Sequence, residues 1–191
     1  MIKQRTIYSL ITAGGVVGLT ASFLETIEYQ EILKNAHTQL VCDLNSVFSC
    51  GNVLNSWQSK IFGFPNSMMC MVFFTLMLSA GLIGLTGGVL VPKLRVWLHG
   101  IALFFLCFAL WFMWESTFRV HALCILCLFC LAGLFTLNWG WLRTNAEILP
   151  IGEHRRMQLQ KAIRQGADVF AWLVLAIFIA FVMFLKFANA K

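Results

Sequence analysis

Five apolar stretches of 17 to 25 residues constrain the fold of this chain more than any other feature. They span residues 7–24, 67–91, 96–114, 122–142 and 169–185. A helix that crosses the hydrocarbon core of a bilayer needs about 20 mostly apolar residues, and the second stretch has no charged residue in its whole length. The sequence therefore predicts an all-α integral membrane protein with five transmembrane helices.

Composition supports this class and indicates one domain. Of 191 residues, 60% are hydrophobic and 12% are charged, whereas soluble domains contain about 25% charged residues. No linker, repeat or low-complexity tract divides the chain, so we expect a single membrane domain over 1–191, with a long outer loop at 25–66 and an inner connector at 143–168. The basic residues behind the net charge of +6 mostly flank apolar stretches, which argues against nucleic-acid binding.

The first apolar stretch has an alternative interpretation as a cleaved signal peptide. Lys3 and Arg5 provide a basic start, and small residues lie near Ala21. However, the apolar run exceeds the usual 7 to 15 residues, and no clear A-x-A cleavage site follows it. We therefore expect an uncleaved first helix.

The distribution of charge predicts which ends of the helices face the cytoplasm. With the amino terminus inside, nine basic residues fall on the inner side: Lys3, Arg5, Lys93, Arg95, Arg143, Arg155, Arg156, Lys161 and Arg164. Five fall outside: Lys34, Lys60, Arg119, Lys186 and Lys191. This asymmetry follows the positive-inside rule. The loop 25–66 and the start of the fourth helix then face the outside, where disulfide chemistry is permitted.

One cysteine pair lies in the long outer loop. Cys42 and Cys50 are separated by seven residues, among which Asp43, Asn45 and Ser46 are turn formers. The chain can therefore reverse and bring the two sulfur atoms together. This disulfide can be redox-active, or it can be a purely structural staple.

A second cysteine pair opens the fourth helix. Cys124 and Cys127 are three residues apart, so they share a helix face. The free amides and dipole of a helix N-terminus stabilise a thiolate, and Arg119 and His121 add positive charge before the helix. Cysteine also occurs as a small core residue in apolar helices. Two dithiols on the same side of the membrane favour a redox function.

The remaining cysteines are predicted to be packing residues. Cys130 continues the three-residue spacing, but no fourth cysteine and proline follow, as an iron–sulfur motif requires. A zinc site built from His121 and the CxxC pair lacks a fourth ligand. We predict no metal, and we assign Cys130, Cys70 and Cys107 to the interiors of helices.

The two pairs together predict an electron relay to a quinone. A loop pair can meet a soluble partner, and a fixed pair can exchange disulfides with it through mixed disulfides. The electron acceptor must dissolve in lipid and take up protons, and an apolar bundle suits a quinone. The chain has no nucleotide-binding glycine motif, and His99 is the only histidine well inside a span, so the paired histidines of a haem site are absent.

These residues resemble the vitamin K epoxide reductase family, and specifically its bacterial branch. The resemblance covers about 7–142 and rests on the order and spacing of four features: Cys42 and Cys50 in the first outer loop, Ser56 six residues later, Phe62-Gly63-Phe64-Pro65-Asn66-Ser67 before the second helix, and Cys124-Ile125-Leu126-Cys127 opening the fourth.

The resemblance implies a four-helix bundle that holds ubiquinone or menaquinone near its outer face. Cys127 would lie beside the quinone, with Cys124 as its partner. Cys42 and Cys50 would be the shuttle pair, and Cys50 would link to Cys124 during transfer. The function implied is that of a disulfide-generating thiol oxidoreductase.

The resemblance also implies roles for residues outside the cysteines. Ser56 matches a signature position near the site, and Asn66 matches an asparagine that hydrogen-bonds a quinone carbonyl. From the sequence alone, Asn66 can equally be a helix cap. Leu131 stands where vertebrate members have a tyrosine, which disfavours vitamin K epoxide as the substrate.

The implied partner is a separate thioredoxin-fold thiol oxidase of the DsbA kind. Bacterial relatives often continue into a thioredoxin-like domain after their fifth helix, whereas this sequence ends at Lys191. The implied location is the bacterial inner (cytoplasmic) membrane, with the active site on the outer face. Residues 52–62 have roughly helical apolar spacing, which predicts a short amphipathic helix that is either a lid over the site or a surface anchor.

Three alternatives remain open at this stage. A DsbB-type enzyme has the same task but the reverse order of cysteine motifs. A non-enzymatic membrane protein would use the loop disulfide only as a staple. A reductive enzyme would run the same thiol chemistry in the opposite direction, from outer thiols to a quinone or its epoxide.

Overall fold

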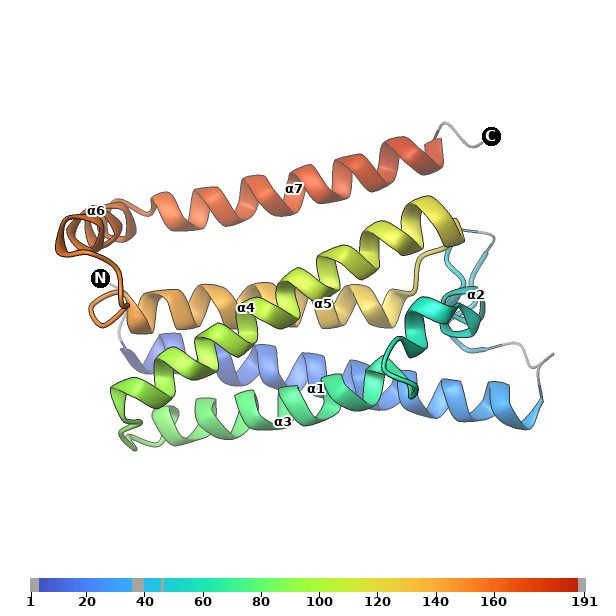
Figure 1. Ribbon diagram of the computed structural model, residues 1–191, viewed down its shortest axis with the longest axis horizontal. Coiled ribbons are helices and arrows are strands. Elements are labelled where there is room, and N and C mark those ends of the chain that lie inside the picture. The colour runs from blue at the N-terminus through green and yellow to red at the C-terminus, as the bar shows by residue number, and fades with distance from the viewer. Residues whose placement is uncertain (1–3, 36–39, 46, 189–191) are drawn as a thin grey trace.

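The computed structural model describes residues 4–35, 40–45 and 47–188, so Lys3, Ser46 and Lys191 lie outside the described residues. The elements, shown in Figure 1, are α1 (Gln4–Lys34), α2 (Cys50–Asn55), the 3₁₀ turn η1 (Trp57–Lys60), α3 (Asn66–Leu85), α4 (Pro92–Glu115), the π-helical turn η2 (Ser116–Val120), α5 (Ile125–Asn145), α6 (Glu153–Arg164) and α7 (Ala167–Ala188). The all-α prediction is confirmed.

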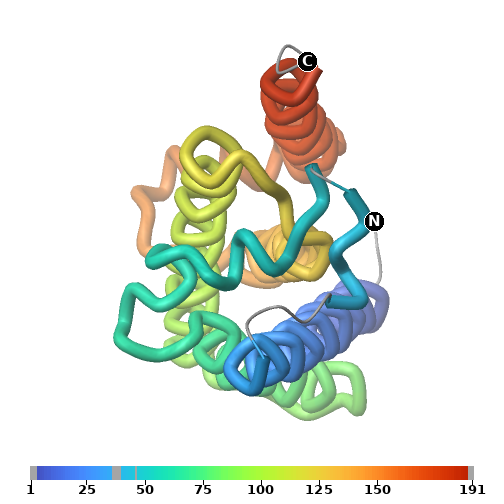
Figure 2. Tube along the Cα trace, turned by 90° about the vertical axis from the view of Figure 1, so that its right-hand side faces the viewer, coloured from blue at the N-terminus to red at the C-terminus, as the bar shows by residue number. Residues whose placement is uncertain are grey.

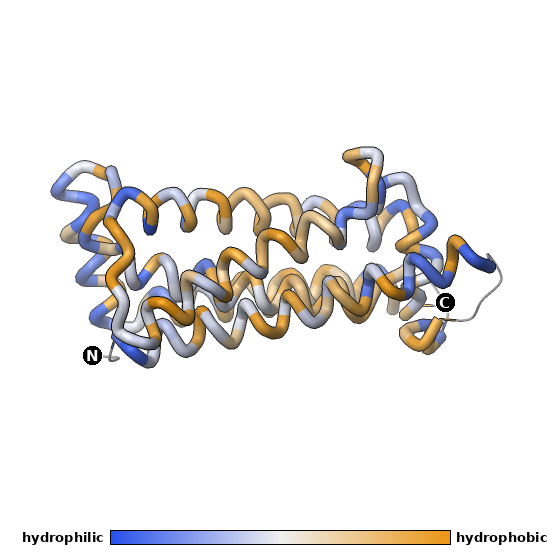
Figure 3. Tube along the Cα trace, turned by 90° about the horizontal axis from the view of Figure 1, so that it is seen from below, coloured by the Kyte–Doolittle hydropathy of each residue, from blue (hydrophilic) through white to orange (hydrophobic). Residues whose placement is uncertain are grey.

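Within the described residues, five helices are long and apolar enough to cross a membrane: α1, α3, α4 with η2, α5 and α7. This confirms the expected multi-pass membrane protein. Figure 3 shows the matching distribution of polarity, because apolar residues fill the middle of the helices and hydrophilic residues gather at both ends. A bilayer requires this arrangement of its spanning helices.

The first helix is longer than the apolar stretch that predicted it. α1 continues ten residues past Leu24 and ends at Lys34. The extension carries several glutamates, which are good helix formers, and Lys34 pairs with Glu31 at 2.7 Å one turn earlier. The predicted loop at 25–66 therefore begins with helix, and Glu25 belongs to the face of α1 that packs into the bundle.

Glycines allow α1 to approach α3 and α5 closely. A Cβ atom on Gly133 of α5 would lie 2.9 Å from the carbonyl oxygen of Gly14, and one on Gly15 would lie 2.9 Å from the Cα of Leu78 in α3. Small residues at helix contacts are typical of membrane bundles because they permit backbone contact. This packing sets α1 firmly against the helix that carries the CxxC pair.

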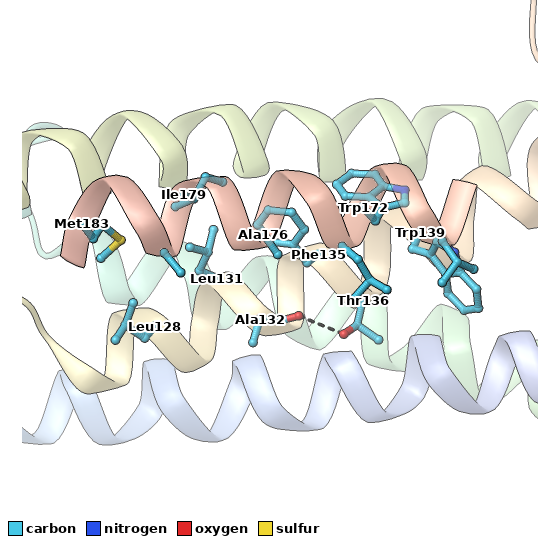
Figure 4. Close-up of a pocket in the computed structure, with 13 residues that line it drawn as sticks. Leu128, Leu131, Ala132, Phe135, Thr136, Trp139, Trp172, Ala176, Ile179 and Met183 are labelled. Carbon is cyan, nitrogen blue, oxygen red and sulfur yellow. Dashed lines mark hydrogen bonds between the residues drawn. The ribbon is translucent and has the colours of Figure 1, made fainter. Parts of the chain in front are cut away.

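The other long helices pack less closely. Figure 2, a view along the bundle, shows α7 standing beside the other four. An apolar groove of about 450 Å³ separates it from α5, and Figure 4 shows Leu131 and Phe135 of α5 and Trp172 of α7 lining this groove. At its start α7 is fixed to α5 by an ion pair between Arg143 and Asp168. The predicted connector at 143–168 contains α6, which has no buried residue.

The segment 52–62 forms two short helical pieces instead of the single amphipathic helix that we expected. Ser56 separates α2 from η1, because its backbone is extended and its hydroxyl donates to the carbonyl of Val53 at 2.6 Å. Val53 in the first piece is completely buried, while Trp57 in the second is 62% exposed. The segment therefore covers the end of the bundle, at the end opposite the amino terminus (Figure 1).

Candidate active site

Backbone hydrogen bonds fasten the cysteine-bearing loop to the segment before α5. The amide of Leu123 donates to the carbonyl of Val47 at 2.7 Å, and the amide of Ser49 donates to the carbonyl of Leu123 at 3.0 Å. These bonds make an isolated parallel bridge between Phe48 and Leu123. We call the two bonds the Leu123 clip. Because Cys50 follows Ser49 and Cys124 follows Leu123, the clip brings those two cysteines together.

Three of the four predicted redox cysteines meet at this point. A disulfide joins Cys42 to Cys50, and the sulfur of Cys124 lies 3.1 Å from the sulfur of Cys50. Cys50 and Cys124 are completely buried, whereas Cys42 is 8% exposed. A thiol placed against a disulfide sulfur is the arrangement from which thiol–disulfide exchange proceeds.

The turn between α4 and α5 sets the position of Cys124. η2 ends at His121, which adopts the left-handed conformation with φ 57°. The hydroxyl of Ser116 donates to the carbonyl of Ala122 and closes the turn. Arg119, which we expected to add positive charge beside the thiols, instead pairs with Glu115 at 3.2 Å.

The fourth cysteine, Cys127, contacts a carboxyl group from another helix. Its sulfur lies 3.2 Å from Oε1 of Glu25 on α1, and both residues are buried. We expected Glu25 in the outer loop and predicted no role for it. A signal existed in the helical spacing, because Gly18, Ser22, Glu25 and Tyr29 recur at three- and four-residue intervals on one buried face of α1.

A small cavity lies beside Cys127 and Glu25. It is lined by side chains from η1 and four long helices: Glu25, Ser59, Asn66, Ser67, Cys70, Phe105, Phe108, Ala109, Phe112, Met113, Cys127, Cys130 and Leu134. The amide nitrogen of Asn66 donates to the carbonyl of Gln58 at 2.7 Å. Its Oδ1 is buried and has no hydrogen-bond partner among the described residues. Such an orphaned acceptor is costly unless a ligand supplies a donor.

In the segment 52–62, Ser59 lines the cavity and Ser56 does not. The hydroxyl of Ser59 donates to the carbonyl of Leu54 at 2.6 Å, which fastens η1 to α2. Gln58 adds a second fastening, because its amide donates to Glu115 of α4 at 3.2 Å. We did not predict a role for Ser59, because its position depends on the break between α2 and η1 at Ser56.

The cysteines that we assigned to packing occupy different environments. Cys70 and Cys130 line the cavity, and the sulfur of Cys130 lies 3.7 Å from the carbonyl of Gly18. Cys107 is exposed on α4. Leu131, at the position discussed for vitamin K epoxide, lines the α5–α7 groove.

The candidate site contains three groups that also occur as metal ligands. One ligand atom from each of Glu25, Cys124 and Cys127 lies within 4.8 Å of the others. A closed zinc site uses four ligands, and this cluster is one short among the described residues. We assign no metal to it.

The cavity suits a quinone in its chemistry. Its walls are aromatic and apolar, the orphaned Asn66 Oδ1 offers an acceptor to a quinol hydroxyl, and a thiol stands at its side. Its internal volume of about 50 Å³ requires side chains to move before a ring enters. An apolar cleft of about 330 Å³ between α3 and α4 adjoins it, and Phe105, stacked on Phe73 at 4.2 Å, lines both spaces.

Comparison with known protein families gives a match over most of the chain. The model of the vitamin K epoxide reductase family matches residues 9–140. The matched segment contains both cysteine pairs and Asn66, and it ends before α6 and α7. No curated protein sequence matches the chain with significance.

Proposed function

Because this chain belongs to the vitamin K epoxide reductase family, we propose that it oxidises the dithiol of a thioredoxin-fold protein and passes the electrons to a membrane quinone. Family membership makes it an oxidoreductase with quinone-linked thiol chemistry. The proposal adds the direction, the donor and the compartment. The observation that carries it is the 3.1 Å approach of Cys124 to the disulfide sulfur of Cys50.

The proposed relay consists of four disulfide exchanges. One donor thiol attacks Cys42, since Cys50 is completely buried, and Cys50 leaves as a thiolate. The second donor thiol then attacks the donor sulfur of this mixed disulfide and releases Cys42. The Cys50 thiolate then attacks Cys124 of the oxidised CxxC pair, and Cys127 leaves as a thiolate. Finally Cys42 attacks Cys50, which restores the loop disulfide and leaves Cys124 and Cys127 reduced. The described arrangement, with one disulfide in the loop and free thiols at Cys124 and Cys127, corresponds to this last state.

In the proposed electron acceptor site, Cys127 is the thiol that reacts, and Oδ1 of Asn66 accepts a hydrogen bond from a hydroxyl of the forming quinol. Ubiquinone or menaquinone supplies a two-electron acceptor that also takes two protons. Ser56 supports the site from a distance by setting the break that brings Ser59 to the cavity. Phe105 lines both the α3–α4 cleft and the cavity, and we assign the isoprenoid tail to the cleft.

We place the protein in the bacterial cytoplasmic membrane with its amino terminus inside. The cysteine loop and the amino terminus lie at opposite ends of the bundle (Figure 1). The basic helix α6 lies at the amino-terminal end, as the positive-inside rule requires of the cytoplasmic side. The cysteines then face the compartment in which disulfides form.

Anaerobic stopped-flow mixing tests the proposal. Purified protein would be mixed with a reduced thioredoxin-fold oxidase of the DsbA kind and a panel of quinones, and quinol formation would be followed by absorbance. We expect turnover that is lost in Cys124→Ala and Cys127→Ala and kept in Cys107→Ala. Full activity in Cys127→Ala would overturn the assignment. Net transfer only from quinol to the oxidised donor would reverse the proposed direction.

A further inference from the structure

Glu25 is a carboxyl group inside the membrane-spanning bundle, in contact with the thiol that we assign to quinone reduction. It is 7% exposed, and its Oε1 lies 3.2 Å from the sulfur of Cys127. No Lys, Arg or His among the described residues forms an ion pair with it within 4.0 Å. Glu25 also lines the cavity that we assign to the quinone ring.

A structural role explains this placement poorly. Burial of a carboxyl group in an apolar bundle is costly, and intramembrane acids are usually functional. A thiol is a weak hydrogen-bond donor, so the bond from Cys127 offsets little of that cost. The other walls of the cavity are mostly apolar, and an apolar side chain at position 25 would pack against them without this penalty.

We propose that Glu25 is the proton acceptor for the Cys127 thiol and passes that proton to the quinone. This inference rests on the proposed function. Glu25 is then a catalytic residue, because it touches a reacting sulfur atom and also lines the cavity into which the proton must go. A positioned general base typically accelerates a reaction by 10²- to 10⁴-fold.

The step balances in protons and electrons. Cys127 gives its proton to Oε1 of Glu25, two electrons pass from its sulfur to the quinone, and the sulfur of Cys124 bonds to it to form the disulfide. The two protons, one from each thiol, end on the two quinone oxygens. Glu25 carries the proton of Cys127 and returns to the carboxylate form. It can then carry the proton of Cys124 as well, because the Cys124 sulfur lies within 4.8 Å of a carboxylate oxygen of Glu25.

Among the described residues that line the cavity, Glu25 is the only carboxyl group. From α5 the titratable groups are Cys127 and Cys130, with Cys124 directly before the helix, and from α3 the group is Cys70. α4 contributes apolar side chains, and η1 contributes the neutral Ser59. On α1 itself the next acid is Glu28, one turn further along, which does not line the cavity.

Alkylation of Cys127 tests this role without any quinone. Quinone-free protein with a reduced CxxC pair would react with N-ethylmaleimide across a range of pH, and mass spectrometry of peptides would give the rate at each cysteine. In wild type we expect the rate at Cys127 to reach a plateau as pH rises, because Glu25 accepts the proton. In Glu25→Gln the plateau should be lost, and the rate near neutral pH should fall by roughly tenfold or more.

Matched variants separate proton transfer from positioning. Glu25→Gln keeps the length and an oxygen acceptor, so a merely structural role predicts an unchanged profile. Glu31→Gln removes a surface charge and its ion pair with Lys34 on the same helix, and the rate at Cys127 should match wild type. The rate at the exposed Cys107 should be the same in every variant. An equal or faster rate at Cys127 in Glu25→Gln would overturn the proposal.

A second variant and a second reaction keep the test decisive. If Glu25→Gln does not fold, Glu25→Asp serves instead, because it shortens the side chain by one methylene and moves the carboxyl group away from Cys127. Alkylation of Cys127 should then slow several-fold. An unchanged rate would count against the proposal. With quinone present, Glu25→Gln should slow quinol formation by roughly 10²-fold while exchange from the loop pair to Cys124 continues. If wild type itself reduces no quinone, the proposed function fails, and the alkylation profile still decides the role of Glu25.

Discussion

The sulfur of Cys124 lies 3.1 Å from that of Cys50, although the two residues are 74 positions apart in the sequence. The Leu123 clip aligns the residues immediately before each cysteine. The buried sulfur of Cys50 is therefore held against Cys124 at the start of α5. An exchange at this contact needs no large movement of either segment.

This contact predicts a trapped intermediate. In Cys42→Ser the thiol of Cys50 has no partner in the loop, so oxidation should join it to Cys124, and no Cys42 thiolate is present to release it. Mass spectrometry of unreduced peptides should find the Cys50–Cys124 disulfide as the main product. Cys107→Ser is the control and should retain the Cys42–Cys50 disulfide. If Cys42→Ser yields only a Cys124–Cys127 disulfide, the proposed relay is wrong.

A second prediction concerns the clip itself. Leu123→Pro removes the amide that donates to Val47, and one hydrogen bond is worth about 1 kcal/mol. We expect electron transfer from the loop pair to the CxxC pair to slow by roughly fivefold or more. The rate would be measured by quenching quinone-free protein at intervals after mixing with a reduced donor. Leu123→Val keeps the amide and should behave as wild type; if it slows equally, side-chain packing is responsible.

The clip also shows what sequence reasoning could not reach. Hydropathy locates the five spans because a bilayer demands about 20 apolar residues from any spanning helix. The cysteine pairs can also be found from the sequence, because their spacing is read directly and the distribution of basic residues predicts their side of the membrane. The Leu123 clip uses backbone amides and carbonyls, which every residue but proline has in full, so no residue type indicates it.

Glu25 escaped prediction for a different reason. A charge at the end of an apolar run normally marks the membrane boundary, and so the first helix was expected to end at Leu24. The physical feature that mattered was the helical period, which continues through Glu25 on the buried face of α1. The position of Ser59 depends on the break in the helix at Ser56, and apolar periodicity does not predict such a break.

Asn66 gives a prediction about the quinone. Its Nδ2 donates to the carbonyl of Gln58, and its Oδ1 has no hydrogen-bond donor among the described residues. Asn66→Ala should lower the rate of quinol formation by roughly tenfold, because the forming quinol hydroxyl loses its buried acceptor, Oδ1. Exchange between the loop pair and the CxxC pair, followed without quinone, should be unaffected. Unchanged quinone kinetics would remove the assigned contact and leave the thiol relay standing.

The cleft between α3 and α4 gives a prediction about the tail of the quinone. Met68 lines this cleft and is 41% exposed. A bulkier side chain in Met68→Trp should obstruct a long isoprenoid tail and raise KM for long-tailed quinones several-fold. A tail-free quinone should keep its KM, because the ring site is untouched. Equal changes for both substrates would show that the tail does not use this cleft.

The ion pair between Arg143 and Asp168 predicts a separable role for the last helix. Arg143 Nε lies 2.5 Å from Asp168 Oδ2, both side chains are more than nine-tenths buried, and the Arg143 guanidinium stacks on Trp139. Asp168→Asn leaves a buried guanidinium without its counter-charge, which costs about 3 kcal/mol when such a pair is broken. We expect a lower thermal unfolding midpoint in detergent and faster proteolysis near α6. Quinone turnover at permissive temperature should be retained, because α7 contributes no residue to the cavity beside Cys127. Replacing both partners by Leu should recover much of the lost stability, whereas an unchanged midpoint in Asp168→Asn would show that apolar contacts with α5 alone hold α7.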